Sequence, residues 1–179
     1  AMSKISNLFN LQLKLKENNI DILIINRSDE FLNEYISPYA ERLKFITNFS
    51  GSAGKAIILQ NEAFLYVDGR YTFQAKEQIN ENEIQSKHLN LFWEDLKNYI
   101  SKDNCKIVID PKLHSIKEIH KIQDYIINSS SIIEFLESNI IDSIWKNKPN
   151  INYSNIFDHT LKYAGDDRIK KLTDFKKYL

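Results

Sequence analysis

A β-hairpin is encoded by the stretch NFSGSAGKAIILQNEAFLYVDGRY, residues Asn48–Tyr71, which holds three of the four glycines in the chain. KAIILQ and AFLYVD, separated by Asn61 and Glu62, are short apolar runs typical of two paired strands. RYTFQAKEQI then has helical spacing. The sequence therefore predicts a hairpin between Lys55 and Asp68 that leads directly into a helix.

Strands and helices alternate on both sides of this hairpin. Upstream, residues 3–18 have helical spacing, and IDILIIN, residues 20–26, is a continuous apolar run typical of a strand covered on both faces. Residues 28–49 show no clear period and are expected to form a long ordered loop with one turn of helix. The expected downstream elements are a helix over 89–100, a strand over 106–110, a helix opened by a capping box of Ser115 and Glu118, a strand over 131–135 and a helix over 139–145. This order predicts an α/β fold: a mixed sheet of about five to six strands with a central hairpin, flanked by helices.

Composition excludes several classes of partner. Lys plus Arg and Asp plus Glu number 24 each, so the whole surface carries no net field, and we expect neither nucleic acid nor a membrane as a partner. No apolar run reaches the roughly 18 residues of a membrane span, and the amino terminus lacks the apolar core of a secretory signal. The single cysteine, Cys105, cannot form an internal disulfide. These features predict a soluble, cytoplasmic protein.

The chain is expected to divide into one main domain and a tail. Ala1 ahead of Met2 is typical of a residue left by tag removal, so residues 1–2 are set apart and the main domain is predicted to span 3–149. After Pro149 the sequence becomes polar and aromatic, and DDRIKKLTDFKKYL begins a helix whose apolar residues have no later partner in this chain. We expect 150–179 to be a linker and the first helix of a truncated following domain.

The glycine stretch and the aspartates beside the predicted strands suggest two chemical interpretations. GSAGK resembles a phosphate loop, but only two residues separate Gly51 from Gly54, Ala56 follows Lys55, and a strand comes next instead of a helix. A metal or nuclease site is the second interpretation, because Asp21, Asp68 and Asp110 all flank predicted strands.

Capping explains those aspartates more simply, since Asp68 precedes a helix and Asp110 precedes a proline. The four histidines, His88, His114, His120 and His159, lack zinc-ligand spacing and are predicted to be surface or partly packed. Ser50 and Ser52 have no recognisable catalytic histidine and acid. No residue is therefore predicted as a catalytic group or metal ligand.

The favoured interpretation of the glycines is architectural. Gly51 and Gly54 are expected to allow a close backbone approach or a positive φ on entering the hairpin, and Gly69 to form a tight strand-to-helix corner. That corner places Arg70 beside Asp68, where it either pairs internally or faces a partner.

In its order of motifs the chain resembles the amino-terminal domain of aminopeptidase P, an Xaa-Pro aminopeptidase of the creatinase and prolidase superfamily. The matching pieces are NEYISPYAERLKFITNFSGSAG, LYVDGRYTFQA, IVIDPKLHS and NIIDSIWKNKP, within Ile20–Pro149. Phe31 stands where the family often has histidine, which puts a polar substrate contact there in doubt. Lys55 replaces a small residue, so we expect its charge to reach solvent.

The resemblance implies a ribonuclease H-like domain of a parent enzyme that removes the first residue of a peptide when proline comes second. Such enzymes use two divalent metal ions, manganese or similar, held in a carboxyl-terminal domain absent here, so this fragment is expected to be inactive and to bind no metal pair. It also implies a homodimer and a wall at the substrate entrance. The candidates for gating or interface contacts are Tyr35, Arg42, Asp68, Arg70 and Tyr71. The alternative is a free-standing scaffold module of the same fold that binds a small molecule or peptide by itself; continuation of the gene past Leu179 would distinguish the two.

Overall fold

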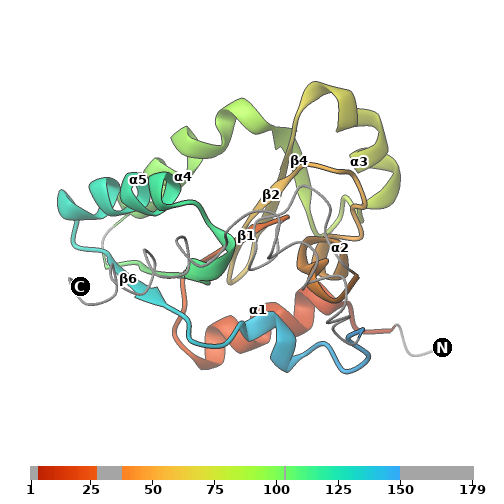
Figure 1. Cartoon of the computed structure of the whole chain (residues 1–179), viewed down its shortest axis with the longest axis horizontal. Helices are drawn as coiled ribbons and strands as arrows, with labels where there is room; N and C mark the ends of the chain where they lie inside the picture. The colour runs from red at the N-terminus through yellow and green to blue at the C-terminus, as the bar shows by residue number, and fades with distance from the viewer. Residues whose placement is uncertain (1–3, 28–37, 103, 150–179) are drawn as a thin grey trace, which may run out of the picture.

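The computed structural model of the chain describes residues 4–27, 38–102 and 104–149. It contains a six-stranded sheet in the order β4-β3-β2-β1-β5-β6 with helices on both faces (Figure 1). The strands are β1 (Ile22–Asn26), β2 (Lys55–Leu59), β3 (Ala63–Val67), β4 (Gln85–His88), β5 (Lys106–Ile109) and β6 (Ile132–Phe135). The α-helices are α1 (Asn7–Glu17), α2 (Arg42–Thr47), α3 (Thr72–Gln78), α4 (Phe92–Ile100) and α5 (Ile116–Ile127). The predicted α/β fold with a mixed sheet is confirmed, and no described helix is long and apolar enough to cross a bilayer.

The predicted hairpin is present at the centre of the sheet. β2 pairs antiparallel with β3, with Lys55 opposite Tyr66, and antiparallel with β1, with Asn26 opposite Lys55. β1 is buried along its whole length, which explains its continuous apolar run. The pairs β1–β5, β5–β6 and β3–β4 are parallel, so every strand except β2 runs in the same direction.

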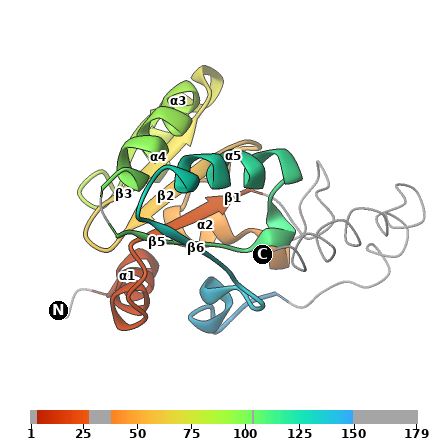
Figure 2. The same ribbon diagram turned by 90° about the vertical axis from the view of Figure 1, so that its left-hand side faces the viewer.

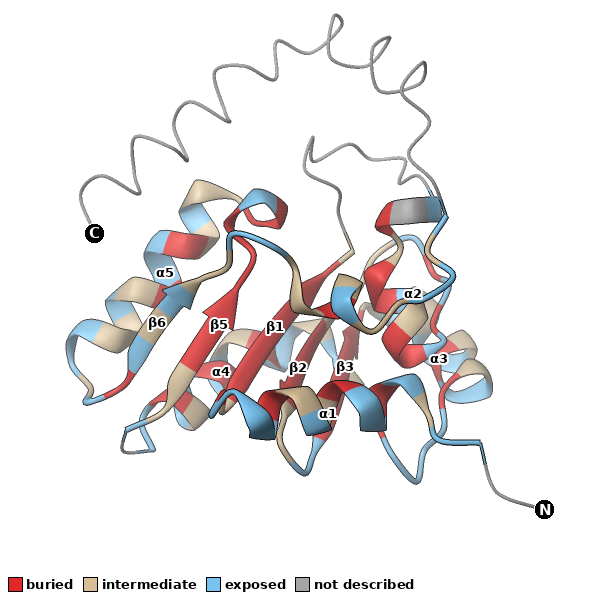
Figure 3. Ribbon diagram, turned by 90° about the horizontal axis from the view of Figure 1, so that it is seen from below, coloured by how far each residue is buried: buried red, intermediate tan, exposed pale blue. Residues whose placement is uncertain are grey.

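The sheet separates two hydrophobic cores because side chains alternate along each strand. Leu23 and Ile25 of β1 pack with α1 and α2, whereas Ile22 and Ile24 pack with α4 and α5. Figure 2 shows α1 on one side of the sheet and α4 with α5 on the other. Figure 3 shows buried residues concentrated in the central strands and exposed ones on the outer helices. Burying each Leu or Ile side chain contributes about 1.5–3 kcal/mol, so these two layers supply most of the folding free energy.

Serine side chains cap two helices. Ser6 Oγ accepts a hydrogen bond from the Phe9 amide at 3.1 Å, and Ser115 Oγ accepts one from the Glu118 amide at 3.1 Å. The Ser115 cap was predicted, but the Glu118 carboxylate does not complete the capping box, because it contacts Lys55 and Asn26 instead. Tertiary contacts with Lys55 and Asn26 therefore replace the local hydrogen bond that Glu118 would make in a capping box.

Two elements differ from the sequence predictions. The helix expected over 139–145 is a 3-10 turn, η5 (Ile140–Ser143), which Asn139 caps and in which Ile141 is buried in the core. β4 was not predicted, since its sequence QSKH is polar throughout. The turn of helix expected within residues 28–49 is present as α2. The predicted linker and helix over 150–179 lie outside the described residues.

Candidate functional site

The carboxyl edge of the sheet gathers the described site candidates. Asp68–Tyr71 follow β3, Gly51–Gly54 precede the reversed strand β2, and Asp110 follows β5. Ligands of open α/β sheets bind at this edge, beyond the carboxyl ends of the strands. Of the two other predicted contact residues, Arg42 lies in α2 and Tyr35 lies outside the described residues. The edge is therefore the candidate functional site.

Asp68 and Arg70 form the corner after β3. Asp68 Oδ1 accepts a hydrogen bond from the Arg70 amide at 2.9 Å, and its Oδ2 lies 2.9 Å from Arg70 Nη2. The Arg70 guanidinium holds the pKa of the Asp68 carboxyl below its ordinary value, and the pKa of Arg70 is raised in return. Arg70 also lies over the Tyr71 ring, 5.5 Å from the centroid. Its side chain is still 78% exposed, so the corner presents an oriented cation to solvent.

The loop before β2 packs against the same corner. The Ser52 hydroxyl and the Tyr71 hydroxyl share a hydrogen bond, and the Phe49 ring meets the Tyr71 ring edge-on at 6.1 Å. A Cβ on Gly51 would lie 2.2 Å from Phe49 Cζ, and one on Gly54 3.1 Å from Leu43 Cδ2. Close approach thus explains these two glycines.

The positive-φ alternative does not hold, because none of the glycines in the described part has positive φ. A Cβ on Gly69 would meet only His88 Nε2 at 3.9 Å, an ordinary contact, so the corner does not require glycine. The left-handed position lies just upstream, at Asn48 with φ 69°. The phosphate-loop interpretation also fails, since Lys55 begins a strand and its ammonium is bound by Glu118.

A polar cluster lies under the edge, on the face covered by α4 and α5. Lys55 Nζ is 2.6 Å from Glu118 Oε1, and Asn26 Nδ2 is 3.0 Å from Glu118 Oε2. Asn26 Nδ2 also lies 2.9 Å from His114 Nδ1, closer than the 3.4 Å from that nitrogen to Glu118.

This cluster overturns two expectations. His114 is 2% exposed and therefore fully packed, whereas the histidines were predicted to be at or near the surface. Lys55 was expected to reach solvent, but its ammonium is paired and lies 4.9 Å from the Phe92 ring centroid. Burial by itself would raise the pKa of Glu118, yet contacts from His114 and Lys55 lower it to about 2. Glu118 is thus a stable anion at neutral pH.

The strand-flanking aspartates do not converge on a metal. Asp21 lies at the opposite edge, where its Oδ2 accepts from the Lys106 amide at 2.8 Å. Asp110 caps the Lys112 amide and accepts from Asn139 Nδ2. Three strand spacings, about 14 Å, separate the ends of β3 and β5, so Asp68 and Asp110 cannot share an ion. Within 4–27, 38–102 and 104–149, no group of three potential ligands is close enough to hold one.

Arg42 faces inward, at the start of α2. Its Nε and Nη2 lie 2.9 Å and 3.1 Å from the two carboxylate oxygens of Asp142. The Arg42 side chain is only 7% exposed, so it can influence the carboxyl edge only through the groups that it contacts.

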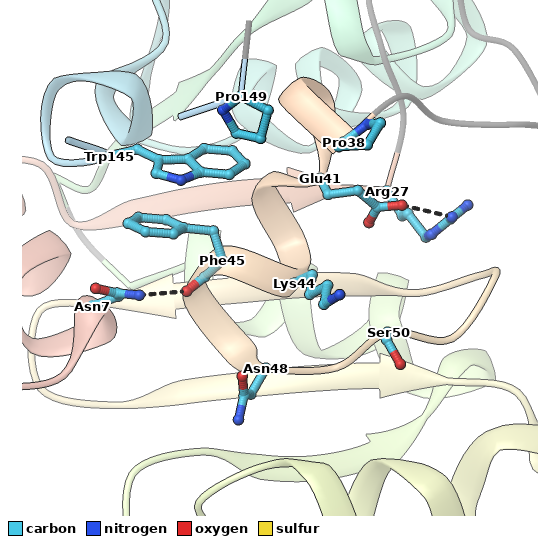
Figure 4. Close-up of a pocket in the computed structure, with 10 residues that line it drawn as sticks. All are labelled: Asn7, Arg27, Pro38, Glu41, Lys44, Phe45, Asn48, Ser50, Trp145 and Pro149. Carbon is cyan, nitrogen blue, oxygen red and sulfur yellow. Dashed lines mark hydrogen bonds and ion pairs between the residues drawn. The ribbon is translucent and has the colours of Figure 1, made fainter. Parts of the chain in front are cut away.

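A groove of about 570 Å³ opens beside α2 (Figure 4). Phe45, Trp145 and Pro149 form an apolar side, and Arg27 and Lys44 supply polar groups. Arg27 joins two elements, since its Nη2 is 2.8 Å from Glu41 Oε1 and its Nη1 donates to the Ser52 carbonyl at 3.0 Å. Sequence reasoning did not single out Arg27, Phe45 or Trp145 individually, because their partners are distant in the sequence.

The comparisons with known proteins agree on the family. The family model described as Creatinase/Prolidase N-terminal domain matches residues 8–142. The chain is 31% identical over 169 residues to a probable Xaa-Pro aminopeptidase P of Coccidioides posadasii, covering 92% of this chain and 26% of that protein. A protein of the same name from Paracoccidioides lutzii is 30% identical, with 92% and 27% covered. The chain thus spans about a quarter of the length of these relatives.

Solved structures show the same fold. An X-prolyl aminopeptidase from Caenorhabditis elegans, described as a cytosolic enzyme with a di-nuclear active site, superposes with a TM-score of 0.70 at 22% identity, over 80% of this chain and 26% of that one. The N-terminal domain of the cytoplasmic peptidase PepQ from Mycobacterium tuberculosis superposes with a TM-score of 0.56 at 16% identity, over 77% of this chain and 97% of that one. Together with the sheet order and the edge described above, these matches place the chain in the creatinase/prolidase N-terminal domain family.

Proposed function

We propose that this chain is the non-catalytic N-terminal domain of a dinuclear-metal aminopeptidase that removes the N-terminal residue preceding proline. The observation that carries the proposal is the match of 92% of the chain to relatives named Xaa-Pro aminopeptidase P, of whose length it covers only 26%. The catalytic groups of such an enzyme would lie in the polypeptide outside this segment. A cytoplasmic location belongs to the same proposal, since the C. elegans neighbour is described as cytosolic.

The metal ions would be held outside this domain. The parent enzyme would use two divalent ions, manganese or similar, as the di-nuclear site of the C. elegans neighbour suggests. Asp21, Asp68 and Asp110 do not fit such a pair, because each already accepts backbone hydrogen bonds at a separate place. The described part of the chain therefore contributes no ligand in this proposal.

The carboxyl edge would help to form the substrate entrance and the dimer. Arg70 is the most direct candidate, because Asp68 and Tyr71 already restrict its guanidinium and little conformational entropy remains to be lost on binding. An oriented arginine suits a carboxylate or carbonyl of a peptide or of a second copy. Arg42 would act only indirectly, through Asp142.

Comparison of two proteins tests this function. The 179-residue chain and the full-length gene product are each assayed with an Xaa-Pro peptide and Mn²⁺. We expect amino-acid release by the full-length protein alone, lost with a chelator and restored by Mn²⁺. Release by the 179-residue chain would contradict the non-catalytic assignment.

Two further results bear on the alternative and on assembly. A gene that stops at Leu179, with a peptide bound by the isolated chain, would favour a free-standing binding module. Sedimentation velocity of the full-length protein should give a dimer, and a monomer would contradict the assembly role.

A further inference from the structure

The segment that ends the described chain is bound to α2 by a two-part contact. The first part is the bidentate pair of Arg42 with Asp142, whose side chains are 7% and 32% exposed. Lys148 Nζ lies 2.9 Å from Asp142 Oδ2 and adds a second cation. Burial opposes ionisation of Asp142, but these hydrogen bonds and charges hold its pKa below the ordinary value. The pair is therefore ionised and directional.

The second part is an aromatic stack one helical turn further along α2. The rings of Phe45 and Trp145 are 4.6 Å apart at an interplanar angle of 14°. Residues three apart lie on one face of a helix, so Arg42 and Phe45 present adjacent contacts. Asp142, Trp145 and Lys148 follow with the same spacing on the other segment. We call these five residues the α2 clamp.

The clamp lies at the end of a long path of the chain across the domain. β6 lies at the outer edge of the sheet, beyond β5. After β6 the chain turns onto the face of α1 and α2, where Ile140 and Ile144 pack on the core (Figures 1 and 2). Trp145 and Pro149 then line the groove beside α2 (Figure 4). Pro149 is thus brought from the far edge of the sheet to the groove beside α2.

α2 is itself connected to the carboxyl edge. Arg27, directly after β1, bonds Glu41 at the start of α2 and the Ser52 carbonyl in the glycine loop. Ser52 in turn bonds Tyr71, the neighbour of Arg70. A chain of directional contacts therefore joins the exit segment to the exposed corner.

We propose that the α2 clamp is an interdomain positioning device, which fixes the direction in which the polypeptide leaves and so orients the carboxyl edge toward the part of the protein that follows. Domains joined by a simple linker move relative to each other by default, because few contacts cross the boundary. A bidentate arginine pair combined with a stacked ring restricts both translation and rotation of the exit segment. The partner is the continuation of the same chain, so the inference rests on the proposed function.

The test measures orientation separately from activity. In the full-length gene product with Cys105→Ser, one spin label is placed at Lys76→Cys on the exposed surface of α3 and one on the polypeptide beyond Leu179. Double electron–electron resonance gives the distance distribution. We expect a narrow distribution for the parent, and at least a twofold broadening in Asp142→Asn and Trp145→Ala. Phe73→Ala, which removes a 74% exposed ring from α3, is the matched control and should change nothing.

The outcomes of this experiment distinguish failure of the clamp proposal from failure of the proposed function. In an active enzyme, the two clamp variants should raise KM several-fold with kcat unchanged. Circular dichroism checks folding, and Trp145→Leu, which keeps apolar area but loses the planar stack, replaces any variant that does not fold. An unchanged distribution in folded variants would overturn the clamp proposal alone. Broadening in a protein without Xaa-Pro activity would instead retain the clamp and reject the proposed function.

Discussion

Lys55 Nζ lies 2.6 Å from Glu118 Oε1, so the first residue of β2 is paired with the first turn of α5 across 63 positions of sequence. Both side chains are mostly covered, with 20% and 25% exposure. The pair joins the central hairpin to the helix layer at the carboxyl edge, and its energetics can be measured directly.

Lys55→Met should destabilise the domain by about 2–3 kcal/mol, because it leaves a mostly buried carboxylate without its cation. Lys55→Met combined with Glu118→Met should recover much of this loss, since an apolar pair of similar size needs no counter-charge. Urea unfolding at pH 7 measures both. Equal destabilisation in the single and double variants would argue against the ion pair as the cause.

Stability should fall in acid as Glu118 is protonated. In the folded protein the pKa of Glu118 is about 2, below the ordinary value of 4.5. The ionised carboxylate therefore makes its full contribution to the free energy of unfolding above about pH 4.5, and this contribution is lost as the pH falls toward 2. The contribution is on the order of 3 kcal/mol. Glu118→Gln should remove this part of the pH dependence, as seen by comparing unfolding of the two proteins between pH 2 and 6. The same pH dependence of the free energy of unfolding in both proteins would be inconsistent with the lowered pKa of Glu118.

Gly51→Ala should cost about 1–3 kcal/mol, because the new Cβ would overlap the Phe49 ring. Gly69→Ala is the matched control, since its Cβ has ordinary contacts; we expect a change between zero and about 1 kcal/mol of stabilisation. Adding Phe49→Leu to Gly51→Ala should relieve part of the overlap. Thermal melting compares the three, and similar melting of Gly51→Ala and wild type would contradict the close-approach explanation.

Tyr66 should make folding sensitive to alkali. Burial, and then the hydrogen bond to Asp95 at 2.7 Å, raise the pKa of this phenol. The protonated Tyr66 therefore makes its full contribution to the free energy of unfolding below about pH 10, the pKa of tyrosine in the unfolded chain. This contribution is lost as the pH rises above that value. Tyr66→Phe should lower the free energy of unfolding by about 1 kcal/mol at pH 7 and should make it fall less steeply above pH 10. Urea unfolding from pH 7 to 11 tests this, and an undiminished decline in the variant would assign the effect elsewhere.

Arg70→Ala in the full-length gene product should raise KM for an Xaa-Pro peptide about tenfold or more, as expected for losing a charge-assisted hydrogen bond, with kcat within about twofold. Its melting temperature should not change, because the side chain is largely exposed. Lys76→Ala, another exposed cation nearby on α3, serves as the control. Identical kinetics for both variants would exclude Arg70 from the entrance.

The hairpin and the central strands were predictable because their signals are local. β1, β2, β3 and β5 are apolar runs bounded by polar or turn residues, a pattern visible without knowing their neighbours. β4 was missed because a polar edge strand is specified by its pairing with β3 and not by its own composition. The 3-10 turn η5 was predicted as a longer helix, because the apolar spacing of its residues does not by itself distinguish a short 3-10 turn from an α-helix.

For the candidate site, the corner was predictable and its surroundings were not. Asp68 and Arg70 are two positions apart, so a cap and an ion pair follow from their order. The roles of Lys55 and His114 were predicted wrongly, because the groups that bind and bury them come from β1 and α5.

Residues within a few positions of one another were enough to specify the order of strands and helices, the hairpin and the serine and aspartate caps, because those structures are closed by short-range hydrogen bonds and side-chain alternation. Only the tertiary structure decided which charged side chains are buried in ion pairs and which are exposed to solvent. Arg42 is buried against Asp142, which is 100 positions away in the sequence, whereas the Arg70 side chain remains exposed. The physical reason is that burial and counter-charge depend on surfaces brought together from distant segments, which no local pattern records.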